Sequence, residues 1–341
     1  MRKKKNLNLK IFCFLLSLFL FTGINELPAQ NRKPDNVTLS LKWLTQSQFA
    51  GYYAALDKGF YNDEGINLVI KPGAPDIDSM SLVSSGVSDF GIQWFADFAA
   101  ARDKGLPLIS IAQILQSNGL VMISKAESGI KTPYDFKGKR VGIWLFGNEI
   151  QFYSLMNQLE IPLGSINISP LKWSIRPFLD NTYDAVMSMR YNEYLSVLES
   201  GYRKEDINII DFADYGMNFP GDIIFTRKST FDNNPGLCIR MVRASLRGWE
   251  WAMKHQEEAV DIVIRHDKSG TLKKNHQMAQ LKEIVRLIKY KEIPLGFHLP
   301  EQAALTVDNL KKNGIITDTL ELSDIYTNAV WEKAVPEGKN R

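Results

Sequence analysis

The side chains of this sequence that could do chemistry stand where predicted strands end, and most of them carry rings or amides. An indole, two amides and two further rings follow a first predicted strand over 37–43, at Trp43, Gln46, Gln48, Phe49 and Tyr52. An indole beside amides at a helix N-terminus offers a stacking face together with paired hydrogen-bond donors and acceptors. The pattern indicates a site for a small, flat, polar molecule. The alternative is that the rings belong to the core and the amides cap the helix.

Three later strand ends extend this set. Gly73 follows the second predicted strand and lets the backbone approach a ligand closely. Trp94 ends the third strand, where it could face Trp43 across a narrow slot, and Gln116 follows the fourth strand. A tight turn at Gly73 and a core position for Trp94 are the structural alternatives.

The second half of the chain repeats the pattern at two junctions between a strand and a helix. The residues at these junctions are Gly147, Asn148 and Glu149, and Tyr191, Asn192 and Glu193. Gly147 and Asn148 would offer backbone amides at a positive helix end, where Glu149 could also simply complement the helix dipole. A carboxylate at Glu193 can accept a pair of N–H groups from a heterocycle. We therefore expect ligand contacts from both halves of the chain.

No known catalytic or metal-binding constellation is present in the sequence. All four histidines fall in the C-terminal third of the chain, at His255, His266, His276 and His298. No pair of them has the spacing of metal ligands. The sequence also holds no nucleophile elbow and no phosphate-binding Gly-Lys-Ser/Thr loop. We therefore expect a binding protein and not an enzyme, with no catalytic residue, no metal and no cofactor.

Residues 1–30 have the pattern of a secretion signal. Basic residues at positions 2–5 and 10 precede an apolar stretch over 11–23, which is shorter than the roughly 20 residues that span a bilayer. Without this segment the chain holds 36 basic and 37 acidic residues and one cysteine, Cys238. Such a charge balance favours neither a nucleic acid nor an anionic membrane as partner. We expect a monomer outside the cytoplasmic membrane, periplasmic or at the cell surface; an uncleaved anchor is the alternative.

Short β-rich runs alternate with amphipathic segments from residue 36 to residue 226, which is typical of α/β architecture. After residue 235 the pattern is helical almost throughout. The prediction is two α/β lobes with a ligand cleft and a two-segment hinge. The first lobe takes residues 31–119 and 224–341, and the second takes residues 120–223. The chain would cross between the lobes near 117–120 and again near 220–224.

The run from Lys42 to Gly65, with Gln48-Phe49-Ala-Gly51-Tyr52-Tyr53 inside it, resembles the opening of one group of ABC-transporter solute-binding proteins. This group includes the alkanesulfonate binders of the SsuA type and the binders of thiamine pyrimidine precursors. Further likeness lies in the motifs at 86–91, 130–142, 147–149 and 191–194. The resemblance implies a type II periplasmic-binding-protein fold, a small ligand between the lobes, and an ABC permease and its ATPase as partners.

Within that resemblance several ligands and roles stay open. A planar heterocycle such as formylaminopyrimidine or hydroxymethylpyrimidine is the preferred ligand, and riboflavin or a sulfonate are alternatives. Binders of formylaminopyrimidine commonly have an Asn-x-Asn-His-Thr-Gly-like opening where this chain has Gln46-Ser-Gln48-Phe49-Ala-Gly51. The group also includes thiamine pyrimidine synthases, which consume a histidine and pyridoxal phosphate. For such an enzyme we would expect pyridoxal phosphate at Lys58, although no histidine is near it. A ligand-sensing module is the remaining alternative.

Overall fold

The computed structural model describes residues 33–145, 149–172 and 174–335, in which ten strands form two sheets of five. The predicted leader and the predicted site residues Gly147 and Asn148 lie outside the described residues. Within the described part of the chain, no helix is both long and apolar enough to cross a membrane. Residues 34–341 form one compact unit, and the lobe bounds predicted from the sequence stay a prediction.

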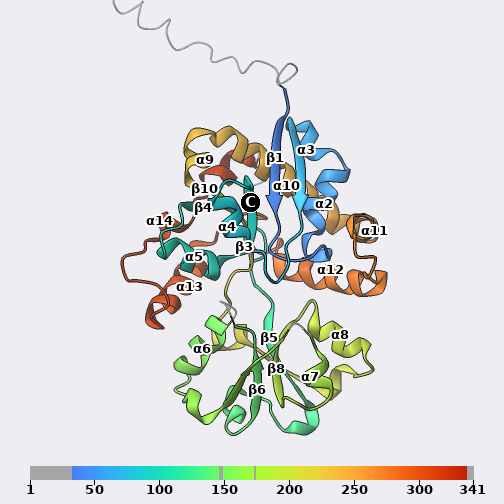
Figure 1. Ribbon diagram of the computed structural model, residues 1–341, viewed down its shortest axis with the longest axis vertical. Coiled ribbons are helices and arrows are strands. Elements are labelled where there is room, and N and C mark those ends of the chain that lie inside the picture. The colour runs from blue at the N-terminus through green and yellow to red at the C-terminus, as the bar shows by residue number, and fades with distance from the viewer. Residues whose placement is uncertain (1–32, 146–148, 173, 336–341) are drawn as a thin grey trace, which may run out of the picture. The chain divides into compact units, whose positions relative to one another are not determined.

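The first sheet has the strand order β2-β1-β3-β10-β4. Its strands are β1 (Asp35–Ser40), β2 (Ile66–Lys71), β3 (Phe90–Trp94), β4 (Leu108–Gln113) and β10 (Asp222–Arg227). β1 pairs in parallel with β2 and β3, and β10 runs antiparallel between β3 and β4. The carboxyl ends of β1 and β3 therefore lie at the same edge of the sheet as the start of β10. Figure 1 labels β1, β3, β4 and β10 of this sheet.

The second sheet has the order β7-β6-β8-β5-β9. Its strands are β5 (Leu120–Lys125), β6 (Arg140–Ile143), β7 (Asn167–Pro170), β8 (Ala185–Met189) and β9 (Ile207–Asp211). β6 pairs in parallel with β7 and β8, whereas β5 is antiparallel to β8 and β9. The carboxyl ends of β6 and β8 consequently share one edge, as those of β1 and β3 do in the first sheet.

Helices connect the strands and form most of the chain after β10. The α-helices are α2 (Ala50–Asp57), α3 (Phe60–Asp63), α4 (Ser79–Ser84), α5 (Phe95–Asp103), α6 (Glu149–Gln158), α7 (Arg176–Leu179), α8 (Glu193–Glu199), α9 (Lys228–Asn233), α10 (Pro235–Lys254), α11 (Gln256–His266), α12 (Lys274–Ile288), α13 (Pro300–Lys312), α14 (Leu322–Ile325) and α15 (Ala329–Ala334). Short 3-10 turns are η2 (Ser47–Phe49), η3 (Ala126–Ser128), η4 (Pro133–Phe136), η5 (Leu163–Ser165), η6 (Lys204–Asp206) and η7 (Phe212–Tyr215).

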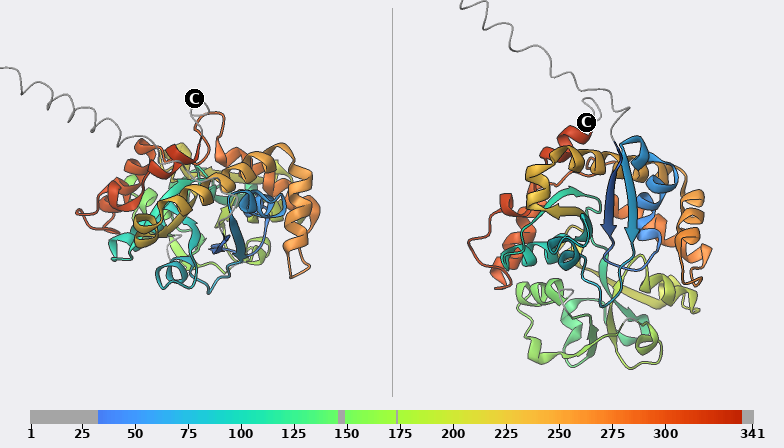
Figure 2. Two further views of the ribbon diagram at one scale, coloured as in Figure 1. Left: turned by 90° about the horizontal axis from the view of Figure 1, so that it is seen from above. Right: turned by 45° about the horizontal axis from the view of Figure 1, so that its top comes forward.

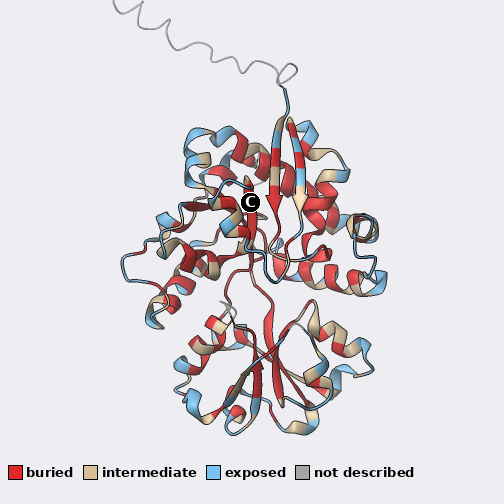
Figure 3. Cartoon of the chain, in the orientation of Figure 1, coloured by how far each residue is buried: buried red, intermediate tan, exposed pale blue. Residues whose placement is uncertain are grey.

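The C-terminal helices pack on the elements of the first sheet. α10 and α11 contact α2, and α15 contacts β4; the gold and orange helices lie beside the blue α2 in both views of Figure 2. α10 and α2 cross closely because Gly248 of α10 meets Gly51 of α2 there. A Cβ on Gly51 would lie 2.2 Å from Trp249 Cδ2. The buried residues in Figure 3 follow the strands of both sheets and the inner faces of the helices.

Two segments join the sheets, one from β4 to β5 and one from η7 to β10. Gly119 lies in the first segment with φ +71°, a conformation that side chains with a Cβ rarely adopt. Gly221 lies in the second, where a Cβ would be 2.9 Å from the Ser117 carbonyl oxygen. The two segments therefore run side by side. α12 contacts α8 and α13 contacts α6, so the C-terminal helices also reach elements of the second sheet.

Candidate functional site

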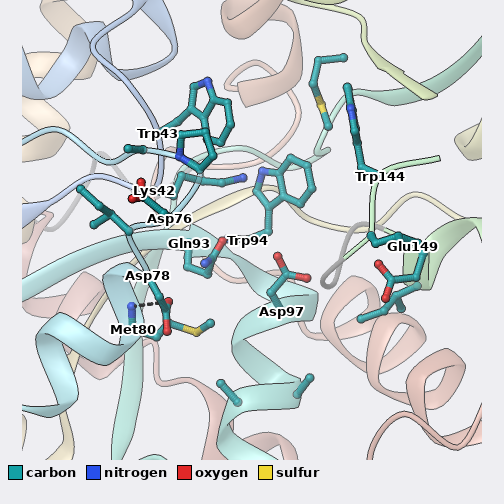
Figure 4. A pocket seen from close by; sticks show the side chains of 18 of the residues that line it. Lys42, Trp43, Asp76, Asp78, Met80, Gln93, Trp94, Asp97, Trp144 and Glu149 are labelled. Carbon is teal, nitrogen blue, oxygen red and sulfur yellow. Dashed lines mark hydrogen bonds between the residues drawn. The ribbon is translucent and has the colours of Figure 1, made fainter. Parts of the chain in front are cut away.

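A cavity of about 980 Å³ is lined by residues of both sheets and their helices. The first sheet contributes residues that follow β1 and β3 and the first turn of α5, and the second contributes residues that follow β6 and β8. In α/β sheets ligands bind at the carboxyl ends of strands, and this cavity lies at those ends in both sheets. Figure 4 shows its charged and aromatic lining.

Eight residues predicted from the sequence line this cavity: Trp43, Gln46, Gln48, Trp94, Glu149, Tyr191, Asn192 and Glu193. They come from the strand ends of both sheets, so the structure brings the two halves of the predicted set together. Their contact with a ligand stays a prediction.

Four other predicted residues are outside the cavity lining and have structural contacts. Phe49 and Tyr52 are fully buried in the core, and the Tyr52 ring meets Trp249 edge-on at 5.6 Å between centroids. The Gly73 N–H donates to the Trp43 carbonyl oxygen over 2.9 Å, and a Cβ on Gly73 would lie 2.5 Å from the Leu41 oxygen.

Gln116 also has a structural partner, because its Nε2 donates to the Phe297 carbonyl oxygen over 2.9 Å. For Phe49 and Tyr52 the core alternative describes the structure, and for Gly73 the turn alternative does.

A chain of buried amides leads from η2 to the start of β10. Gln46 Nε2 donates to Gln48 Oε1 over 2.8 Å, and Gln48 Nε2 donates to Asp222 Oδ2 over 2.9 Å. Asp222 is 1% exposed, and burial raises the pKa of its carboxyl to about 6 in spite of the nearby Lys42. These two amides therefore hold a buried carboxylate at the start of β10.

Lys42 extends from the end of β1 to the indole of Trp94, with its Nζ 3.2 Å from the ring centroid. A cation over an indole face is an attractive contact. Burial lowers the pKa of this ammonium to about 8, and the carboxylates of Asp222 and Asp97 oppose the shift. Figure 4 shows Lys42 reaching Trp94 at the cavity.

Three carboxylates lie near one another at the cavity, on different elements. Asp97 is in the first turn of α5, Glu149 begins α6, and Asp78 caps α4 by accepting the Met80 N–H over 3.0 Å. Burial raises the pKa of Asp97 to about 6; Lys42 lowers it, whereas Glu149 and Asp78 raise it. In Figure 4 Asp97 and Glu149 face each other from opposite sides of the cavity.

The second sheet presents Glu193 at the start of α8. Its carboxylate accepts the Met189 N–H over 2.9 Å and Asn192 Nδ2 over 2.8 Å. Burial raises the pKa of this carboxyl, and these hydrogen bonds oppose the rise. His276 of α12 contacts Asn192 Oδ1 at 3.1 Å and Glu199 Oε1 at 2.9 Å, so a helix of the C-terminal part reaches the same wall.

Five charged residues of the cavity lining were missed from the sequence, namely Lys42, Asp76, Asp78, Asp97 and Lys104, and so was Asp222, which lies near Lys42. Lys42 and Asp222 stand at strand ends, like the rings and amides that were predicted, so the same signal could have found them. Asp97 resembles an ordinary acidic residue in a first helical turn and carries no such signal. Trp144, which follows β6 and lines the cavity, was not predicted as a site residue.

Lys58, the lysine expected to hold pyridoxal phosphate in an enzyme, is not in the cavity lining. It pairs with Glu258, and its Nζ lies 4.3 Å from the ring centroid of Trp251. Among the described residues no group of three His, Cys, Asp or Glu side chains is arranged to hold a metal ion. The arrangement of rings, amides and carboxylates can stack on a flat molecule and hydrogen-bond its edges.

A family model and two related proteins match most of this chain. Residues 46–259 match the family model described as NMT1/THI5 like. The formylaminopyrimidine-binding protein of Halalkalibacterium halodurans is 22% identical over 259 residues, which cover 75% of this chain and 78% of that protein. The 4-amino-5-hydroxymethyl-2-methylpyrimidine phosphate synthase of Legionella pneumophila is 36% identical over 258 residues, covering 70% and 75%.

Among solved structures, the periplasmic aliphatic sulphonate binding protein SsuA from Escherichia coli superposes with a TM-score of 0.66 at 16% identity. The match covers 85% of this chain and 91% of SsuA. At 16% identity this structural likeness shows that the two proteins share a fold. The chain has the periplasmic-binding-protein fold, with two α/β lobes, and it belongs to the NMT1/THI5-like family.

Proposed function

We propose that this protein is the extracytoplasmic solute-binding component of an ABC importer. Its proposed ligand is a small planar heterocycle such as a thiamine pyrimidine precursor of the formylaminopyrimidine or hydroxymethylpyrimidine type. The observation that carries the proposal is the cavity of about 980 Å³, to which both sheets contribute indoles and polar side chains. The relative that is named a formylaminopyrimidine-binding protein supports the ligand class.

Trp43, Trp94 and Trp144 line this cavity with apolar rings, of which Trp43 is the most exposed. Each aromatic stacking contact contributes about 0.5–1.5 kcal/mol beyond area burial, and each hydrogen bond contributes about 1 kcal/mol. Together with burial of the ring these contacts can give micromolar or tighter affinity, about −8 kcal/mol. Glu193 and Asn192 would fix the orientation of the ligand.

The charge of the lining favours a neutral or cationic heterocycle over a sulfonate. Five carboxylates line the cavity against two ammonium groups, Lys42 and Lys104; the carboxylates are Asp76, Asp78, Asp97, Glu149 and Glu193. A sulfonate is an anion and would be repelled by this excess of carboxylates. Riboflavin, which is planar and uncharged, remains the alternative ligand.

Transport would follow from closure of the two sheets around the ligand. The chain passes between the sheets through two segments that run side by side, which is the arrangement of a hinge. The closed form would present a surface to an ABC permease and its ATPase. A leader over residues 1–30 would deliver the protein to the periplasm or the cell surface.

A thiamine pyrimidine synthase is the second candidate, because the relative from Legionella pneumophila is 36% identical. This candidate can be tested with pyridoxal phosphate alone. A visible absorption band that forms with wild type and is lost in Lys42→Met or Lys58→Met would favour the enzyme. The importer proposal expects no such band.

The proposal is tested by a thermal-shift panel with the purified protein. The panel contains formylaminopyrimidine, hydroxymethylpyrimidine, thiamine, riboflavin and an alkanesulfonate. A ligand at 100 times its Kd stabilises the native state by about 2.7 kcal/mol, which raises the melting temperature by several degrees. We expect the largest rise with formylaminopyrimidine. A rise with the sulfonate alone, or with no compound, contradicts the proposal.

A further inference from the structure

The ammonium of Lys42 has three N–H donors but no acceptor among the described residues. It lies over the Trp94 ring at 3.2 Å and makes no hydrogen bond to the described part of the chain. An ammonium removed from water costs free energy unless its donors find acceptors. The described part of the chain therefore leaves the Lys42 ammonium available to an acceptor on a ligand.

Asp97 is a hydrogen-bond acceptor that has no donor among the described residues. Its carboxylate can accept several hydrogen bonds, yet it accepts none from a side chain or backbone group in the described ranges. Its α5 is held in place by neighbours on both sides: Phe95 meets Tyr326, and α13 packs against the helix. The carboxylate is thus presented to the cavity by a fixed helix.

Lys42 and Asp97 are close enough to influence each other, but they do not form an ion pair within 4.0 Å. Both line the same cavity. The donor group and the acceptor group therefore line one cavity without pairing with each other. A ligand in this cavity can satisfy both.

We propose that Lys42 and Asp97 together recognise one edge of the ligand, at which a hydrogen-bond acceptor stands beside an N–H donor. Lys42 donates to the acceptor, and Asp97 accepts from the donor. The inference rests on the proposed function and makes it more specific. A ring nitrogen beside an exocyclic amine, as in an aminopyrimidine, has this edge, and so does a ring carbonyl beside a ring N–H. A sulfonate offers acceptors only and cannot satisfy Asp97.

Other charged groups face this pair and must be considered. Asp222 of β10 lies beneath Lys42, while Glu149 of α6 and Asp78 at the start of α4 lie near Asp97. Asp222 already accepts two bonds from Gln48 Nε2, at 3.2 and 2.9 Å. It therefore balances the charge of Lys42, whereas Asp97 stays available to a ligand.

The test measures binding of formylaminopyrimidine and of its analogue with hydrogen in place of the exocyclic amine. We expect wild type to bind the analogue at least tenfold more weakly, because Asp97 then lacks its donor. Lys42→Met and Asp97→Asn should each weaken binding of formylaminopyrimidine at least tenfold. Asp97→Asn should also reduce the discrimination between the two compounds to about threefold or less.

Matched controls come from groups outside the cavity. Lys58→Met also removes a lysine that lies over an indole, Trp251, and Asp103→Asn removes a carboxylate from the same helix as Asp97. Both should bind formylaminopyrimidine within about twofold of wild type. A pH series from 7 to 9 adds an independent readout: wild-type affinity should fall toward pH 9, and that of Lys42→Met should not change.

The inference is overturned if wild type binds both compounds within threefold of each other. This comparison of two compounds uses wild type alone, so it tests the inference even where a substitution impairs folding. It is equally overturned if Lys42→Met and Asp97→Asn fold and bind like the controls. If wild type binds no heterocycle of the panel, it is the proposed function that fails. If wild type binds formylaminopyrimidine without discrimination, only this inference fails.

Discussion

The two indoles at the end of β1 and β3 have different surroundings. Trp43 is half-buried, whereas Trp94 is 6% exposed and carries the Lys42 ammonium over its ring. Trp43 is therefore the more exposed of the two rings at the cavity, and Trp94 serves to position Lys42.

This difference predicts a specific loss on substitution. Trp43→Ala should weaken binding of formylaminopyrimidine at least tenfold, because stacking and apolar burial are both removed. Trp251→Ala, which removes a half-buried indole of α10 outside this cavity, should leave affinity within about twofold. Equilibrium fluorescence titration measures both. Equal affinities for the two variants would contradict the stacking role.

The site could be predicted in part at the scale of residues. Rings and amides predicted at strand ends line one cavity because carboxyl ends of parallel strands share an edge. Phe49 and Tyr52 were placed with them because they occur in the same run of sequence, but the helical period turns both into the core. Asp97 could not be predicted, since its role depends on Lys42, which lies 55 positions earlier in the chain.

The elements were predicted closely, because strand and helix periods are strong in this sequence. The third strand, expected to end at Trp94, is β3 (Phe90–Trp94), and the strand expected before Tyr191 is β8 (Ala185–Met189). The helix expected beside the amides that follow Trp43 starts instead as a 3-10 turn at Ser47, and α2 begins at Ala50. Contacts from α12 fix this turn: the Ser47 N–H donates to Gln277 Oε1 over 2.7 Å. Such a contact, 230 positions away, leaves no local signal.

The segment from β4 to β5 depends on a glycine. Gly119 has φ +71°, and a Cβ there would lie 2.7 Å from Leu287 Cδ1 and 3.2 Å from Tyr191 Cδ1. Gly119→Ala should lower the free energy of unfolding by about 1–2 kcal/mol, mostly through backbone strain.

Urea unfolding measures this loss, with Gly164→Ala as the control. Gly164 does not have a positive φ, and a Cβ there would meet nothing within 4 Å. The control should stay within about 0.5 kcal/mol of wild type. If both variants unfold at the same urea concentration as wild type, the strained geometry of this connection is wrong.

At the scale of the whole molecule, a buried histidine ties the C-terminal helices to the first sheet. His298 is 1% exposed, and its ring Nε2 lies 2.7 Å from Ser110 Oγ of β4. Its backbone N–H donates to Asn328 Oδ1. Burial lowers the pKa of its imidazole to about 3. The unfolded chain therefore takes up a proton below pH 6.5 that the folded chain takes up only near pH 3.

The direction in which pH changes stability follows from the order of these two pKa values. The contribution of His298 is complete above pH 6.5 and is lost as the pH falls toward 3. Between pH 7 and pH 5 wild type should lose about 2 kcal/mol more stability than His298→Gln. Asp97 and Asp222 have raised pKa values and act in the opposite direction, but they are common to both proteins. Urea unfolding at the two pH values checks this, and equal losses would contradict it.

The central claim is that the two halves of the chain bind one planar heterocycle between them, and calorimetric titration with formylaminopyrimidine tests it most directly. Trp43 comes from the first sheet and Glu193 from the second. Wild type should bind one equivalent with micromolar or lower Kd, and Trp43→Ala and Glu193→Ala should each weaken binding at least tenfold. If either variant binds within threefold of wild type, the ligand does not lie between the two sheets as the account requires.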